Sequence, residues 1–146
     1  MKLSENFTLE ELIATNTGLP NRPRENEEEK LLYLASYILQ PIRDRWRALK
    51  ITSGYRSIPV NTAVGGFPTS QHCEGEAVDF YPLEAGIKDV YRWLVEDSKL
   101  RFGQAIYEHK SDDTTWIHVS LIRLTKPYSE ALVFNGRGYE PYNGRL

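Results

Sequence analysis

The spacing of apolar residues changes near Lys50, and this change constrains the fold class more than any other feature of the sequence. Before it, apolar side chains recur at helical spacing on one face, from Leu31 to Leu49. After it, short strand-like runs alternate with glycine-rich or polar loops, and one helical stretch covers about residues 83–96. The sequence therefore predicts an α+β fold.

Two helices are expected before the strands. Thr8 and Glu11 form a capping box, so a short helix should cover residues 9–15. A second cap at Asn26 begins the main core helix. Within that helix, Pro41 should cause a kink or a break, because proline has no backbone N–H to donate.

The strand-like runs indicate how the second half of the chain is arranged. They are found at residues 50–55, 76–81, 103–108, 115–121 and 130–134. The third and fourth runs are joined by a polar loop and predict a β-hairpin. This pairing favours a small, mostly antiparallel sheet with flanking helices. The turn-rich segment 135–146 is expected to wrap the surface or to fray.

Composition excludes several classes of protein. The chain has 146 residues, 40% of them hydrophobic, which suits one domain over residues 1–146. A formal net charge of −2 provides no positive field to attract nucleic acid or a membrane surface. One cysteine, Cys73, excludes an internal disulfide and an all-thiolate zinc site. No signal-peptide pattern or membrane-spanning run is seen, so the protein is expected to be cytoplasmic when synthesised.

Two of the three histidines lie in settings that a bound metal ion would explain. Asp79 follows His72 across a glycine turn, and a carboxylate at this spacing can curl back to share a metal. The spacing alone also fits a solvated loop histidine. In W-I-H-V-S, alternation places His118 on the face of Trp116 and Ser120, opposite the apolar side chains. Two histidines and one aspartate leave the fourth zinc position open, which is typical of catalytic zinc.

Five ordered motifs resemble the zinc D-alanyl-D-alanine carboxypeptidase family, which includes murein peptidases and phage endolysins and shares its fold with the hedgehog signalling domain. The motifs are ITSGYRS, VNTAVGG, SQHCEGEAVDF, QAIYE and WIHVS. NFTLEELIAT and LQPIRDRW fit the same family, so the resemblance covers about residues 5–121 and leaves 122–146 as a C-terminal extension. The resemblance implies a hedgehog/DD-peptidase-like single domain that binds one Zn²⁺ ion.

The resemblance also implies roles for individual residues. The family's zinc ligands correspond to His72, Asp79 and His118. The arginine of S-G-Y-R-S corresponds to Arg56, which would pair with a substrate carboxylate or with the developing oxyanion; a planar, permanently charged guanidinium suits this task. In several relatives the catalytic glutamate stands three residues before the last histidine, and that position holds Thr115 here.

The general base is therefore sought elsewhere in the chain. Glu108 ends the strand that should pair with the His118 strand, so its carboxylate can reach the site. Asp112 and Asp113 in the hairpin loop are the competing candidates, although aspartate is common in turns.

Four further residues have a structural and a functional interpretation. Ser70 binds substrate or caps its loop, and Trp116 lines the substrate groove or packs in the core. His109 is a solvated residue or one that contacts substrate, and Cys73 fits a semi-buried thiol because no histidine remains to act as its base. Ser70 and Trp116 are kept as candidate substrate-binding residues.

The predicted function is that of a zinc metallopeptidase that hydrolyses amide bonds in the stem peptides or cross-links of peptidoglycan. Either D,D-carboxypeptidase or endolysin endopeptidase activity fits, and the site of action would be the cell wall or periplasm, for example during phage lysis of a host. The alternatives are a non-catalytic zinc module that binds the wall or another partner, and a virion component that penetrates the wall. A monomer is assumed.

Overall fold

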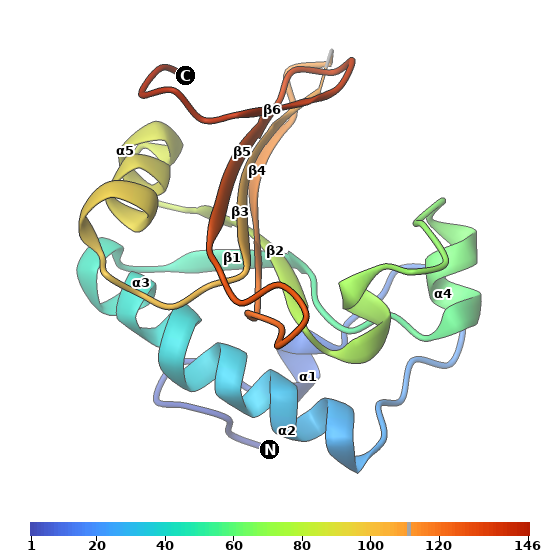
Figure 1. Ribbon diagram of the computed structural model, residues 1–146. Helices are drawn as coiled ribbons and strands as arrows, with labels where there is room; N and C mark the ends of the chain where they lie inside the picture. The colour runs from blue at the N-terminus through green and yellow to red at the C-terminus, as the bar shows by residue number, and fades with distance from the viewer. Residues whose placement is uncertain (111) are drawn as a thin grey trace.

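A mixed six-stranded sheet with strand order β1-β2-β4-β3-β5-β6 forms the frame of the molecule (Figure 1). The computed structural model describes residues 1–110 and 112–146. Its strands are β1 (Leu49–Ser53), β2 (Ala77–Pro82), β3 (Gln104–His109), β4 (Thr115–Ser120), β5 (Glu130–Phe134) and β6 (Tyr139–Pro141). Four of the five strand pairs are antiparallel, while β3 and β5 are parallel. The α+β class and the mostly antiparallel sheet are therefore confirmed.

The helices are short, apart from one long helical segment that lies along the sheet (Figure 1). They are α1 (Leu9–Leu12), α2 (Glu25–Leu34), α3 (Gln40–Trp46), α4 (Ile58–Ala63) and α5 (Ile87–Arg92). A π-helical turn joins α2 to α3 and another extends α5, and a 3₁₀ helix at Gln71–Glu74 precedes β2. Within the described part of the chain, no helix has both the length and the apolar character needed to cross a membrane.

The two expected helix caps differ in outcome. Thr8 caps α1 as predicted, since its Oγ1 accepts a hydrogen bond from the Glu11 N–H at 3.3 Å. The predicted cap at Asn26 is wrong, because α2 begins at Glu25 and its cap is Arg24, two residues before Asn26. The buried Glu27 carboxylate accepts the Arg24 backbone N–H at 2.6 Å and so satisfies a free N–H at the start of the helix.

The expected irregularity at Pro41 takes the form of a π-helical turn over Ala35–Leu39. This wider turn directly precedes α3, and Pro41 occupies the first turn of α3. In a regular α-helix the proline ring would clash with the carbonyl group four residues earlier, and the wider π-helical turn before it relieves this clash. The helical segment therefore continues past the proline and keeps its apolar face toward the sheet.

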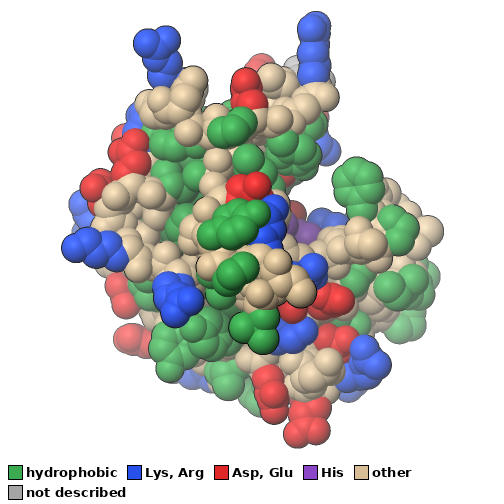
Figure 2. Space-filling view, in the orientation of Figure 1, with side chains coloured by type: hydrophobic (Ala, Val, Ile, Leu, Met, Phe, Trp, Pro, Cys, Tyr) green, Lys and Arg blue, Asp and Glu red, His purple; other side chains and the backbone are tan. Residues whose placement is uncertain are grey.

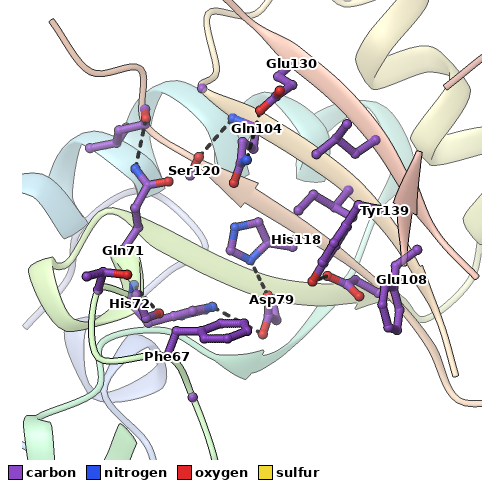
Figure 3. A pocket seen from close by; sticks show the side chains of 18 of the residues that line it. Phe67, Gln71, His72, Asp79, Gln104, Glu108, His118, Ser120, Glu130 and Tyr139 are labelled. Atoms are coloured by element: carbon purple, nitrogen blue, oxygen red, sulfur yellow. Dashed lines mark hydrogen bonds and ion pairs between the residues drawn. The ribbon is translucent and has the colours of Figure 1, made fainter. Parts of the chain in front are cut away.

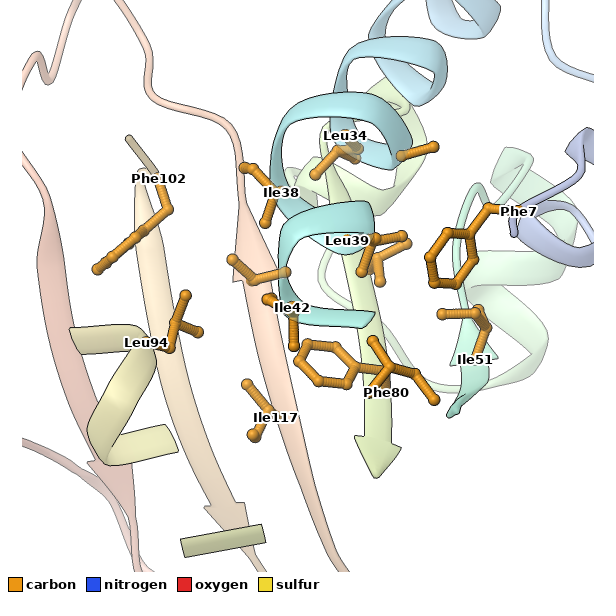
Figure 4. Packing of buried hydrophobic residues seen from close by; sticks show 14 of the residues in the cluster. Phe7, Leu34, Ile38, Leu39, Ile42, Ile51, Phe80, Leu94, Phe102 and Ile117 are labelled. Atoms are coloured by element: carbon orange, nitrogen blue, oxygen red, sulfur yellow. The ribbon is translucent and has the colours of Figure 1, made fainter. Parts of the chain in front are cut away.

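The core lies between this helical segment and the inner face of the sheet (Figure 4). Ile38 and Ile42 from the helical segment belong to the same buried cluster as Phe80 on β2 and Ile117 on β4, and all four are fully buried. Alternation along β4 sends Ile117 inward and leaves His118 on the outer face, as the sequence predicts. The inner face of the sheet thus packs in the core, and the outer face presents polar side chains such as His118.

The end of the chain completes the sheet instead of fraying. Strand β5 pairs with β3, and β6 pairs in turn with β5. After β6, Tyr142 packs against the buried Tyr91 with ring centroids 5.4 Å apart. Of the two expected outcomes for residues 135–146, packing on the rest of the molecule agrees with the structure and fraying does not.

Candidate active site

Strand pairing aligns polar side chains on the outer face of the sheet. One row runs from Ser53 on β1 through Asp79 on β2 to His118 on β4. A neighbouring row joins Trp116 on β4 to Glu108 on β3. Directly paired residues point to the same side of a sheet, so these five side chains face a common space.

His72, Asp79 and His118 form a compact cluster in which the candidate ligand atoms all lie within 4.8 Å of one another (Figure 3). His118 Nδ1 lies 2.9 Å from Asp79 Oδ1 across the β2–β4 pair. His72 approaches from the 3₁₀ helix, with its Nε2 3.4 Å from Asp79 Oδ2. The structure thus brings together the three residues that the sequence suggested as metal ligands.

The donor set of this cluster fits one divalent metal ion. His72 Nδ1 lies 2.8 Å from the carbonyl oxygen of Gly54, and a hydrogen bond from Nδ1–H leaves the Nε2 lone pair directed at the cluster. Metal-binding histidines in proteins are usually held in this way by a second hydrogen bond. Two imidazoles and one carboxylate suit zinc, and they also suit other first-row divalent ions.

The charge state of Asp79 suits a ligand. Burial would raise the pKa of Asp79, but the neighbouring imidazoles of His72 and His118 hold it well below its ordinary value. Arg56 adds a positive charge, with Nη2 3.5 Å from Asp79 Oδ2. The carboxylate is therefore ionised, as metal coordination requires.

Arg56 is fixed beside the cluster by two further side chains. Its Nε donates to Ser53 Oγ at 2.9 Å, and its Nη1 donates to Asn61 Oδ1 at 3.2 Å. Asn61 is buried on α4, and its Nδ2 also donates to the carbonyl oxygen of Phe67 at 2.8 Å. The guanidinium is thus positioned before any ligand arrives, which is the condition for strong electrostatic stabilisation of an anion.

The cluster opens into a cleft of about 950 Å³. Figure 2 shows the cleft as a hollow in the surface with a histidine side chain visible inside it. One side is lined by the loop after α4, including Phe67, which is 77% exposed. The other is lined by the C-terminal segment, including Tyr128, Phe134 and Tyr139. This volume lies at the upper end of the range of about 300–1,000 Å³ that is usual for ligand-binding pockets.

Glu108 lies in this cleft, where its side chain is buried and faces the outer side of the sheet. Burial and, to a lesser extent, the charge of Asp79 raise the pKa of Glu108, although His118 opposes this effect. The Tyr139 hydroxyl donates to Glu108 Oε1 at 3.4 Å. A buried carboxylate with a raised pKa is well suited to exchange protons near neutral pH.

The competing aspartates lie elsewhere. Asp112 accepts the Thr114 backbone N–H at 3.0 Å, and the Asp113 side chain is 95% exposed. Neither residue lines the cleft. Thr115, at the position where several relatives have glutamate, lies 2.9 Å from His109 Nδ1 through its Oγ1. The geometry therefore favours Glu108 over the loop aspartates as the base, and its catalytic role stays a prediction.

Ser70 and Trp116 both line the cleft. Ser70 Oγ also accepts the His72 backbone N–H at 3.2 Å, so it caps the 3₁₀ helix that carries His72. The Trp116 ring lies 5.2 Å from Lys110 Nζ. Cys73 is a partly buried free thiol, and burial raises its pKa. The substrate-binding roles of Ser70 and Trp116 stay predictions.

Sequence reasoning missed two residues of the site. Asn61 lies within the motif V-N-T-A-V-G-G, but nothing in the motif indicates that its amide holds Arg56. Tyr139 follows a glycine turn far from every motif, and its place beside Glu108 depends on strand β6, which was not predicted. Only the pairing of β5 with β6 reveals this contact.

Comparison with known proteins agrees with the chemistry of the cluster. Residues 5–120 match the family described as Peptidase M15. No curated protein matches the chain significantly. Peptidases of the M15 family depend on a metal ion, and the match includes His72, Asp79 and His118. Because the match extends over most of the chain and the donor set agrees with it, this chain belongs to the Peptidase M15 family of metallopeptidases.

Proposed function

We propose that this metallopeptidase uses zinc and hydrolyses amide bonds in the stem peptides or cross-links of peptidoglycan. The observation that carries the proposal is the cluster of His72, Asp79 and His118 on a cleft that also holds Arg56 and Glu108. The sequence motifs that resemble murein peptidases supply the substrate class. The proposed site of action is the cell wall or periplasm.

The two histidines and Asp79 would hold the ion. Lewis-acid polarisation of a substrate carbonyl and acidification of nearby water are the chemistry that zinc supplies at such a site. Arg56, already held by Ser53 and Asn61, pairs with a substrate carboxylate or with the oxyanion that develops on the carbonyl oxygen.

Glu108 moves the proton. As general base it accepts a proton from the attacking water, and as general acid it delivers that proton to the nitrogen of the leaving amine. Its raised pKa, caused mainly by burial, favours both steps near neutral pH. General acid–base catalysis of this kind contributes about 10²- to 10⁴-fold to the rate.

Thr115 favours a second candidate function, a non-catalytic zinc module that binds wall peptides, because several relatives have their glutamate at this position. The retention of Arg56 and of a buried Glu108 on the cleft favours catalysis. A phage enzyme for host lysis and a virion component for wall penetration would both use the same site, so neither changes the proposed chemistry.

Digestion of purified murein, analysed by mass spectrometry, tests the proposal. We expect peptide fragments from the zinc-loaded protein and none after chelation. Glu108→Gln should cut at least about 100-fold more slowly while still binding zinc. Glu29→Gln, at an exposed position on α2, is the matched control and should cut at the normal rate.

Failure of the zinc-loaded wild-type protein to cut any murein preparation would contradict the peptidase proposal. If that protein nevertheless bound murein peptides through the cluster, the binding-module alternative would replace it. If fragments appear, their masses identify the bond that is cut and separate endopeptidase from carboxypeptidase action.

A further inference from the structure

Strand β6 lies outside the residues that match the family, yet it contributes a side chain to the cleft. The Tyr139 hydroxyl donates to Glu108 Oε1 at 3.4 Å (Figure 3). Tyr139 is 54% exposed as a residue, but its hydroxyl points toward the buried carboxylate. The contact therefore joins the C-terminal segment to the residue proposed as the base.

The strand register fixes the direction of this tyrosine. Phe134 on β5 pairs with Glu108 on β3 and with Tyr139 on β6, so the three residues form one row across the sheet. The rings of Phe134 and Tyr139 pack with centroids 4.7 Å apart. The Asn135 side chain accepts the Arg137 backbone N–H at 3.0 Å and braces the turn between the two strands. The hydroxyl is thus held in place by pairing and by aromatic packing together.

The hydrogen bond matters because the Glu108 side chain has few other restraints. Within residues 1–110 and 112–146, its carboxylate accepts a hydrogen bond from Tyr139 and from no other side chain. A donor on Oε1 leaves Oε2 available for a proton and limits rotation of the carboxylate. A base that is held in the productive orientation transfers protons faster than one that must find it.

We propose that Tyr139 is a positioning residue of this peptidase, and that its hydroxyl orients the Glu108 carboxylate for proton transfer. This inference rests on the proposed function, in which Glu108 is the general base. The Tyr139 hydroxyl acts on Glu108 and not on the bound peptide. Removal of this hydroxyl should therefore lower kcat and leave KM unchanged. Removal of a hydrogen bond to a charged group is expected to lower kcat by about 10- to 100-fold.

Tyr142→Phe is the matched control for Tyr139→Phe. Tyr142 directly follows β6, and its hydroxyl also donates to a carboxylate, that of Glu96 at 2.8 Å. Tyr142 does not line the cleft. Both substitutions remove one tyrosine–carboxylate hydrogen bond from the C-terminal segment, so a general loosening of this segment would affect the two variants alike.

The first readout does not depend on activity. Burial and the Glu108 carboxylate raise the pKa of Tyr139. In zinc-loaded protein with ¹³Cζ-labelled tyrosine, an NMR titration should therefore show Tyr139 ionising at lower pH in Glu108→Gln than in the wild type. An unchanged Tyr139 titration would overturn the proposal.

The second readout is the rate of murein peptide hydrolysis. Tyr139→Phe should lose about 10- to 100-fold in kcat, and Tyr142→Phe should keep the wild-type value. The double variant Tyr139→Phe/Glu108→Gln should be no slower than Glu108→Gln alone, because the tyrosine acts only through Glu108.

Equal rates for Tyr139→Phe and Tyr142→Phe, or a double variant slower than Glu108→Gln, would overturn the Tyr139 assignment alone. A wild-type protein that cuts no murein peptide would instead contradict the proposed function. The proposed role of Tyr139 would then be contradicted as well, because it requires Glu108 to act as the general base.

Discussion

Asn61 shows how one buried amide connects two parts of the site. Its Oδ1 accepts the Arg56 guanidinium, and its Nδ2 holds the carbonyl oxygen of Phe67. Gly66 packs so closely that a Cβ there would lie 2.0 Å from Asn61 Oδ1. The amide therefore cannot turn without releasing both Arg56 and the loop that carries Phe67.

Replacing Asn61 by alanine should weaken both stability and substrate binding. The Phe67 carbonyl would keep the Ser70 N–H as a donor but lose the Asn61 amide, which costs about 0.5–1.5 kcal/mol of unfolding free energy. Arg56 would lose a restraint, so KM for a murein peptide should rise. Urea unfolding and steady-state kinetics measure the two effects. Asn26→Ala, exposed on α2, is the control. A normal KM in the Asn61 variant would mean that Asn61 supports only the loop.

At the scale of elements, Glu76 ties together three parts of the chain. Its carboxylate accepts Lys30 Nζ from α2 at 2.9 Å and Arg123 Nε from the turn after β4 at 2.8 Å. It also accepts the Gln71 side chain of the 3₁₀ helix at 3.3 Å. Burial would raise the pKa of Glu76, but these hydrogen bonds lower it below its ordinary value.

The Glu76 contacts should make stability depend on pH in acid. Because the pKa of Glu76 is lower in the folded state, its contribution is complete above its unfolded pKa of about 4.5 and is lost as the pH falls through the folded value. Glu76→Gln should therefore cost about 1–3 kcal/mol in urea unfolding at pH 7 and less at pH 3. Glu29→Gln is the exposed control. An equal difference at both pH values would contradict the ionic role.

Elements whose signals are local were predictable from the sequence. The alternation in β4 and the Thr8 cap depend on neighbouring residues, and both agree with the structure. Strand β6 was not predictable, because its three residues are all exposed and β5 provides its pairing. The cap of α2 was misplaced because Glu27 is paired with Arg24 and buried, which the spacing of Asn26 and Glu29 does not reveal.

The residues of the site could be predicted from the sequence where they lie within a family motif. His72 and Asp79 are close in sequence, whereas Asp79 and His118 are 39 residues apart and meet only through the β2–β4 register. The family resemblance nevertheless identified all three residues of the cluster. It offered nothing for Tyr139, which lies beyond the matched residues, so its contact with Glu108 had to come from the structure.

At the scale of the whole molecule, the cluster connects distant parts of the chain. His72 comes from the 3₁₀ helix, while Asp79 and His118 come from two central strands. An unfolded chain does not bring these donors together, so a metal ion binds the folded state selectively. Binding of this kind stabilises the fold as a unit.

Removing the metal should therefore lower the melting temperature. Zinc at 100 times its Kd adds about 2.7 kcal/mol, and each kcal/mol corresponds to about 2–4 °C for a domain near this size. Thermal unfolding with zinc and with a chelator measures the shift. His118→Ala should abolish it, while His109→Ala, outside the cluster, should retain it. A shift that persists in His118→Ala would place the ion elsewhere.

The position of β4 in the sheet also determines when the protein becomes competent during synthesis. Strand β4 lies between β2 and β3 but is made after both of them. Until residues 115–120 leave the ribosome, the nascent chain lacks His118, and the first three strands cannot form their final sheet. Tyr128, Phe134 and Tyr139, which line one side of the cleft, are synthesised later still. The metal cluster can therefore form only after β4 has been synthesised, and the complete cleft forms only when the C-terminal segment has followed it.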